Sequence, residues 1–189
     1  MKDHIKNLRS ISDGLASGEI KSASSLKSAA EALRKISESM VDDDPNTKID
    51  LTSFISELNG DLALEYASMI QYLQHSSVIK SPGFESFIPH LLEHAKEEFE
   101  HAKMISEKIS YLGGTPVISM AEAFGSDDNQ QMLLLDLQSE RTAIERYKKR
   151  IRQAEELGEY GVKNMLEQIL IQEEEHENDI MNILGLERG

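Results

Sequence analysis

Apolar side chains recur every three or four residues over four long stretches of this chain. In residues 51–80 these positions are occupied by Ile55, Leu58, Leu62, Met69 and Ile79. Residues three and four apart share one face of a helix, so this spacing predicts an amphipathic helix. The same periodicity covers roughly residues 84–112, 129–157 and 162–184. We therefore predict an all-α protein with four long helices.

Turn-forming residues separate these four stretches. Ser81-Pro82-Gly83 follows the first, Gly113-Gly114-Thr115-Pro116 ends the second, and a turn from Gly158 to Gly161 precedes the fourth. Between the second and third lies a long connection that closes with the capping residues Ser126-Asp127-Asp128. Two short turns and one long connection predict a four-helix bundle made of two antiparallel hairpins joined by a crossover.

Charged side chains interrupt each apolar stripe, although core positions are normally apolar. The six interruptions are Glu65, Glu98, His101, Glu140, Glu173 and His176. The midpoint of Glu65 and Glu98 is 81.5, and that of Glu140 and Glu173 is 156.5, so both midpoints fall at a predicted hairpin turn. Each lone glutamate therefore faces a Glu-x-x-His motif at the same height across a hairpin.

The two halves of the chain repeat this pattern at a constant offset. The differences 140−65, 147−72, 173−98 and 176−101 are all 75, and the repeat includes Tyr72 and Tyr147. Two such hairpins bring four carboxylates and two imidazoles into one bundle core. Those groups are the ligand set of a two-metal site.

Four carboxylates in one dry core repel each other and take up protons unless cations neutralise them. Two divalent cations would do so, and Glu-x-x-His directs both of its side chains toward one ion. Mixed oxygen and imidazole ligands suit iron or manganese, with zinc as an alternative. The competing interpretation is a buried network of hydrogen bonds and protonated acids, which the constant offset disfavours.

Tyr72 is the candidate catalytic residue outside the ligand set. It lies two turns after Glu65 on the same face, where it could hydrogen-bond to a ligand or supply an electron during oxygen chemistry. The alternative, which we favour for Tyr147, is a core aromatic residue whose hydroxyl finds a carboxylate.

Two further groups of residues near Glu98-x-x-His101 give weaker indications of a role at the metal site. His94 lies one turn before Glu98 and is either a partner of a ligand or an ordinary core histidine. We interpret the cluster of Glu93, Glu97 and Glu100 as a solvated helix face.

Composition and charge narrow the function classes. The chain has no Cys, which excludes disulfides, thiolate zinc sites, iron–sulfur clusters and cysteine nucleophiles. Its net charge of −14 repels nucleic acid and attracts cations. No apolar run reaches membrane-spanning length, and the N-terminus lacks a signal-peptide core. We expect a cytoplasmic protein that binds neither nucleic acid nor membrane.

Residues 51–184 resemble the ferritin-like superfamily, specifically its bacterioferritin and Dps-like branch. The segments that carry this resemblance are Leu58-Asn59 to His75, Glu98-x-x-His101 with Leu112-Gly113 and Pro116, Glu140, and Leu170 to His176. The resemblance implies a di-iron carboxylate site bridged by Glu98 and Glu173. Glu65 and Glu140 would be terminal ligands, with His101 and His176 one on each ion.

The resemblance also implies a ferroxidase, which oxidises Fe(II) with dioxygen or hydrogen peroxide and stores the ferric product in a homo-oligomeric cage. Phe99 stands where bacterioferritins have a haem-ligating Met, so haem is not expected. Only 13 residues follow His176, too few for the fourth helix to finish and a fifth to follow, which favours a twelve-subunit shell or a smaller oligomer over a twenty-four-subunit shell. The alternatives are a non-storage rubrerythrin-like peroxidase or manganese catalase, and a purely structural bundle with a vestigial site.

Residues 1–50 have no counterpart in that resemblance. Within them, residues 22–41 have helical spacing of Leu26, Ala30, Leu33, Ile36 and Met40, and residues 42–46 form an acidic linker. We predict an N-terminal extension over 1–50 and a ferritin-like di-metal bundle over 51–189. The extension could pack on a neighbouring subunit, block a pore, dock to a partner or form a flexible tail.

Overall fold

The computed structural model describes residues 26–32, 35, 49–80 and 83–187. These residues form four long helices: α3 (Leu51–Val78), α4 (Ile88–Tyr111), α5 (Asn129–Glu156) and α6 (Tyr160–Leu184). A short 3-10 helix, η1 (Glu85–Phe87), precedes α4, and residues 26–32 form a further helical segment. Within the described ranges there is no β-strand, so the all-α prediction is confirmed.

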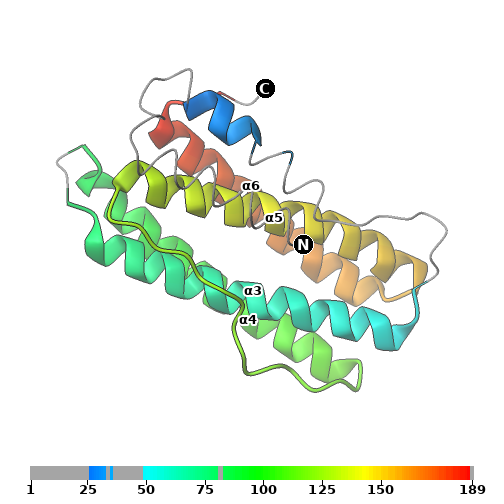
Figure 1. The fold of residues 1–189 in the computed structure, drawn as a ribbon. Coiled ribbons are helices and arrows are strands. Elements are labelled where there is room, and N and C mark those ends of the chain that lie inside the picture. The colour runs from blue at the N-terminus through cyan, green and yellow to red at the C-terminus, as the bar shows by residue number, and fades with distance from the viewer. Residues whose placement is uncertain (1–25, 33–34, 36–48, 81–82, 188–189) are drawn as a thin grey trace.

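The four long helices form a bundle of two antiparallel hairpins, α3–α4 and α5–α6 (Figure 1). The connection between α4 and α5 runs along the length of the bundle, so α4 and α5 point in the same direction. This crossover confirms the predicted topology. In the described part of the chain, no helix is both long enough and apolar enough to cross a membrane.

Polar side chains of α3 hold the crossover against the bundle. The Asn59 Oδ1 atom accepts a hydrogen bond from the backbone N–H of Val117 at 2.8 Å. Further along α3, the Gln71 Oε1 atom accepts a hydrogen bond from the backbone N–H of Phe124 at 2.9 Å. These bonds satisfy backbone groups of a long irregular segment and fix its course over α3.

The helix ends follow the capping residues of the sequence. Asp50 accepts a hydrogen bond from the Ser53 N–H at 2.7 Å, and Asp128 accepts one from the Gln131 N–H at 2.9 Å. Both acids satisfy an N–H group that lacks a partner within its helix. Gly113 follows α4 with a φ of 85°, a left-handed conformation that costs glycine no steric strain.

Helix α4 begins later than the sequence indicates. The expected start is near Phe84, but the chain first makes the 3-10 turn η1 and becomes α-helical at Ile88. Pro89 lies in the first turn of α4, where its missing N–H group and restricted φ are tolerated. The hydrophobic period continues through the 3-10 turn, so it does not reveal the change of helix type.

A layer of polar side chains divides the core into two apolar clusters. Along every long helix, the residues that interrupt the apolar stripe lie between members of the two clusters. On one side lie Tyr72, Leu91, Ala95, Leu133, Leu137, Ile180 and Leu184, and on the other Phe54, Leu58, Leu62, Ile105, Tyr147, Leu166 and Ile169. Both sides of the polar layer are therefore closed by apolar packing.

The helical segment 26–32 packs on one end of this bundle. Leu26 and Ala30 join the cluster that contains Leu184, and the Arg141 Nη1 atom donates a hydrogen bond to the Ala30 carbonyl at 2.6 Å. This agrees with the expected amphipathic helix over its described part. Leu33, Ile36 and Met40 and the acidic linker lie outside the described residues, and a boundary at residue 50 stays a prediction.

Candidate metal centre

The six interrupting side chains come together in the middle of the bundle, and each is at most 3% exposed. They form two groups, one of Glu65, Glu98, His101 and Glu173, and one of Glu98, Glu140, Glu173 and His176. In each group, one potential ligand atom from every residue lies within 4.8 Å of the others. Glu98 and Glu173 belong to both groups, which is the sharing expected of carboxylates that bridge two ions.

The Nδ1 atoms of both imidazoles face the shared carboxylates. His101 Nδ1 lies 3.4 Å from Glu98 and 3.1 Å from Glu173. His176 Nδ1 lies 3.3 Å from Glu98 and 3.8 Å from Glu173. One nitrogen of each ring is thus directed into the same carboxylate cluster.

Each of the six side chains has one buried atom without a hydrogen-bond partner among the described residues. These atoms are Glu65 Oε2, Glu98 Oε1, His101 Nδ1, Glu140 Oε2, Glu173 Oε1 and His176 Nδ1. An unpaired buried polar atom costs about 1–3 kcal/mol, so six of them at one place need an explanation. Carboxylate oxygens with imidazole nitrogens fit two divalent cations of iron, manganese or zinc.

Burial and mutual repulsion keep protons on part of this site. Burial raises the pKa of Glu65 to about 8, and the charge of Glu98 adds to the shift. The same two causes raise the pKa of Glu173 well above its ordinary value. Burial lowers the pKa of His101 and His176, but attraction to the surrounding carboxylates outweighs it and raises both values. All four shifts favour the protonated forms of Glu65, Glu173, His101 and His176 in the metal-free protein.

Binding of divalent ions is therefore expected to release protons, because ligating carboxylates and imidazoles must lose theirs. Metal affinity should therefore rise with pH, and the contribution of Glu65 to this rise should end above its pKa of about 8. Calorimetric titration with Co(II) in buffers of different ionisation enthalpy measures this release. A binding heat that does not depend on the buffer would contradict the predicted release of protons.

Each of the two tyrosines forms a hydrogen bond to a glutamate on the other hairpin. The Tyr72 hydroxyl donates a hydrogen bond to Glu140, and the Tyr147 hydroxyl donates one to Glu65. Both tyrosines are almost fully buried. On its own helix each tyrosine lies two turns from a lone glutamate, but its partner is the lone glutamate of the other hairpin.

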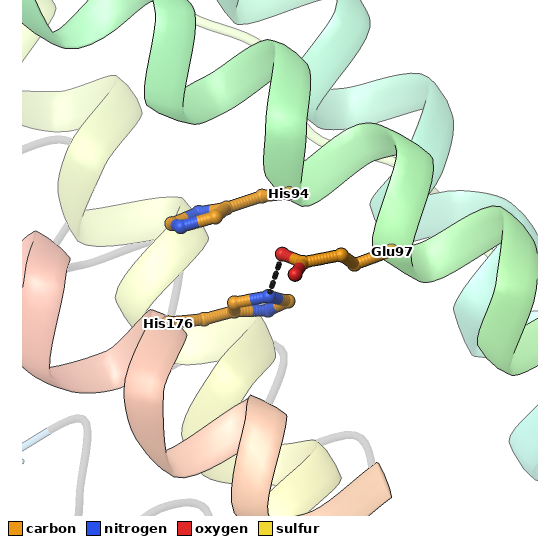
Figure 2. Close-up of side chains that lie close together, drawn as sticks. All are labelled: His94, Glu97 and His176. Carbon is orange, nitrogen blue, oxygen red and sulfur yellow. Dashed lines mark hydrogen bonds and ion pairs between the residues drawn. The ribbon is translucent and has the colours of Figure 1, made fainter.

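The outer nitrogen of each imidazole also has a partner on the opposite hairpin. His176 Nε2 donates a hydrogen bond to Glu97 at 2.8 Å (Figure 2), and His101 Nε2 donates one to the Gln172 Oε1 atom at 3.1 Å. Carboxylate and amide oxygens only accept, so each Nε2 atom carries a proton and Nδ1 is the nitrogen that could bind an ion once it is deprotonated.

The interpretation of Glu97 as a solvated residue is wrong. Its side chain is only 34% exposed and reaches His176, whereas Glu93 and Glu100 are exposed as expected. The ring of His94, on α4, stacks on that of His176 with centroids 4.1 Å apart (Figure 2). His94 is thus a neighbour of a candidate ligand, one of the two alternatives left open by its spacing.

Two buried acids beside the site were missed by sequence reasoning. Asp61 accepts a hydrogen bond from the Arg150 Nε atom at 2.6 Å, and Asp136 lies 2.8 Å from the His75 Nδ1 atom. Asp61 lies one turn before Glu65, and Asp136 lies one turn before Glu140. Asp136 lies 75 residues after Asp61, and Arg150 lies 75 residues after His75. A search for polar residues at this offset therefore finds both pairs.

The family model for the ferritin-like domain matches residues 55–189. A bacterial ferritin of Neisseria meningitidis serogroup B is 32% identical over 123 residues, which cover 65% of this chain and 80% of that protein. Two solved structures are similar over the bundle. A dodecameric thioferritin, the bacterioferritin-related protein of Bacteroides fragilis, has a TM-score of 0.68 and 29% identity, covering 73% of this chain and 88% of that one.

The second structure is a ferritin-like, diiron-carboxylate protein from Bacillus anthracis str. Ames. It has a TM-score of 0.70 and 30% identity, and covers 73% of this chain and 99% of that one. The match of the family model, the bundle of two hairpins and the buried carboxylate and histidine clusters all agree. This chain belongs to the family of proteins with a ferritin-like domain.

Proposed function

We propose that this protein is a ferroxidase that binds two Fe(II) ions as its substrate at the six-residue site. The observation that carries this proposal is the convergence of six unpaired buried ligand atoms in a ferritin-like bundle. Each Fe(II) loses one electron. Two electrons and two protons convert one dioxygen molecule into hydrogen peroxide. With hydrogen peroxide as the oxidant, two electrons and two protons convert one peroxide molecule into two water molecules.

In this proposal Glu98 and Glu173 would serve both positions, because they belong to both groups of ligand atoms. Glu65 with His101 would complete one position. Glu140 with His176 would complete the other; the full metal set is Glu65, Glu98, His101, Glu140, Glu173 and His176. Iron at the site supplies a one-electron redox couple at each position.

The residues around the ligands hold the site in shape. The hydroxyls of Tyr72 and Tyr147 direct one oxygen of each lone glutamate, and the Nε2–H bonds orient the imidazoles. Bonds of this kind set ligand orientation and basicity. The apolar clusters on both sides limit the entry of water, which strengthens the electrostatic interactions within the site.

The test is rapid mixing of the metal-free protein, preloaded anaerobically with Fe(II), against dioxygen or hydrogen peroxide. The fast oxidation should saturate at two Fe(II) per chain, and comparison of the two oxidants identifies the preferred one. A protein that shows no fast phase with either oxidant is not a ferroxidase.

We further propose that the ferric product is stored in a homo-oligomeric shell. The net charge of −14 attracts cations, and the similar protein of Bacteroides fragilis is dodecameric. Light scattering measures the mass of the assembly. A mass near twelve or twenty-four chains supports storage, whereas one or two chains would move the function to a non-storage peroxidase or catalase.

Tyr72 is proposed as the catalytic tyrosine, because its ring lies next to His94 and His176, with centroids 5.2 and 6.3 Å away. Replacing Tyr72 with Phe should slow Fe(II) oxidation by about 10-fold more than replacing Tyr147 does, because each variant costs a glutamate one hydrogen-bond donor but only Tyr72 would also supply an electron. The matched control is Tyr147→Phe, which removes the equivalent bond to Glu65. Equal initial rates in the two variants would mean that both tyrosines only orient the glutamates and that Tyr72 has no catalytic role.

A further inference from the structure

The two halves of the site differ in the groups that hold the imidazoles. Glu97 and Gln172 occupy equivalent positions, since 172−97 is 75 and each directly precedes a shared glutamate. Each also reaches the outer nitrogen of the histidine on the other hairpin. One partner is a carboxylate and the other an amide, so the repeat is symmetric in position and asymmetric in charge.

Hydrogen bonds join these partners into one chain across the bundle. The Gln172 Nε2 atom donates to Glu97 Oε1 at 3.4 Å, while the Gln172 Oε1 atom accepts from His101 at 3.1 Å. Glu97 Oε2 accepts from His176 at 2.8 Å. The amide orientation is consistent with both of its bonds. The negative charge of Glu97 therefore contacts His176 directly and reaches His101 only through a neutral amide.

His176 has a second neighbour that His101 lacks. The His94 ring stacks on the His176 ring with an interplanar angle of 26° (Figure 2). The position equivalent to His94 is Ile169, since 169−94 is 75. Two residues of α4 thus restrain the orientation of His176, one by an ionic hydrogen bond and one by stacking.

We propose that Glu97 makes the two ion positions unequal, so that the position served by His176 binds a divalent cation more tightly and fills first. This inference rests on the proposed two-metal site. A carboxylate polarises the imidazole N–H group more strongly than an amide does, which increases the electron density on the ligating Nδ1 atom. Removal of such a partner lowers metal affinity by about 10- to 100-fold.

The experiment is a titration of the metal-free full-length protein with Co(II), followed by calorimetry and by visible absorption. Wild-type protein should bind two ions in separate steps whose affinities differ by about 10- to 100-fold. His176→Ala should remove the tighter step, and His101→Ala should remove the weaker one. These two variants assign each step to a position.

Two exchanges of similar shape then test the role of charge. Glu97→Gln keeps a hydrogen-bond acceptor for His176 and should weaken only the tighter step, which brings the two affinities together. Gln172→Glu should strengthen the weaker step. Glu93→Gln, an exposed residue on the same helix, removes the same charge without contact to the site and should change neither step. Circular dichroism of the metal-free variants checks that each keeps its helix content.

The inference is overturned if Glu97→Gln still binds two ions with unchanged affinities, or if it weakens both steps equally. It is also overturned if His101→Ala, rather than His176→Ala, removes the tighter step. A wild-type protein that binds no Co(II) at this site would instead refute the two-metal site, and the proposed function with it. Two ions bound with equal affinity would leave the ferroxidase proposal intact and reject only the inequality.

Discussion

Replacement of Glu98 with alanine will abolish rapid oxidation of Fe(II), with an expected loss of initial rate of about 100-fold or more. Glu98 belongs to both groups of ligand atoms, and its carboxylate lies 3.4 Å from His101 Nδ1 and 3.3 Å from His176 Nδ1. Its removal therefore disturbs both ion positions at once, which loss of Glu65 or Glu140 would not do.

The rate is measured by rapid mixing of Fe(II)-loaded protein with dioxygen, and helix content by circular dichroism. Glu93→Ala is the matched control, because Glu93 is exposed on the same helix. This variant should oxidise Fe(II) at the wild-type rate. Glu98→Gln preserves the shape of the side chain and serves if the alanine variant folds poorly. An unchanged initial rate in both Glu98 variants would refute the assignment of the site.

Removal of metal will lower thermal stability substantially. A divalent ion present at 100 times its dissociation constant stabilises the folded state by about 2.7 kcal/mol per site, hence about 5 kcal/mol for two sites. For a chain of this size each kcal/mol corresponds to about 2–4 °C in Tm, so metal should raise Tm by about 10–20 °C. This stabilisation would come from pairing of the cations with the six buried atoms that otherwise lack partners among the described residues.

Differential scanning calorimetry of the chelator-treated protein, with and without Co(II), measures this shift. The control is the double variant Glu98→Ala/Glu173→Ala, which lacks both shared carboxylates and should show little response. A similar shift in the double variant would mean that the stabilising ions bind elsewhere, for example on the acidic surface. Protein concentration should be held constant, since assembly also changes Tm.

The helices and the convergence of the six candidate ligands could be predicted because their signals are local and repeated. The apolar period marked each long helix to within a few residues, except at η1, where a 3-10 turn continues the same period. Glu98 and His101 share one helix face by their spacing alone. Glu65 is expected at the same height as Glu98 because a hairpin pairs residues equidistant from its turn.

The groups that hold the ligands could not be predicted in the same way. Glu97 is adjacent to Glu98 and lies at helical spacing from two exposed glutamates, so its position along the helix indicated solvent. Only the approach of α6 brings His176 within reach of its carboxylate. The bond from Tyr72 to Glu140 likewise joins helices of different hairpins.

The sequence by itself determined the helical bundle, the pairing of helices within hairpins and the residues that line the polar layer. These follow from periodicity, turn residues and the offset of 75, each of which is a relation along the chain. The tertiary structure alone decided which residue of one hairpin contacts which residue of the other. Such contacts depend on how the two hairpins pack and on the reach of individual side chains, and neither is encoded in spacing along one helix.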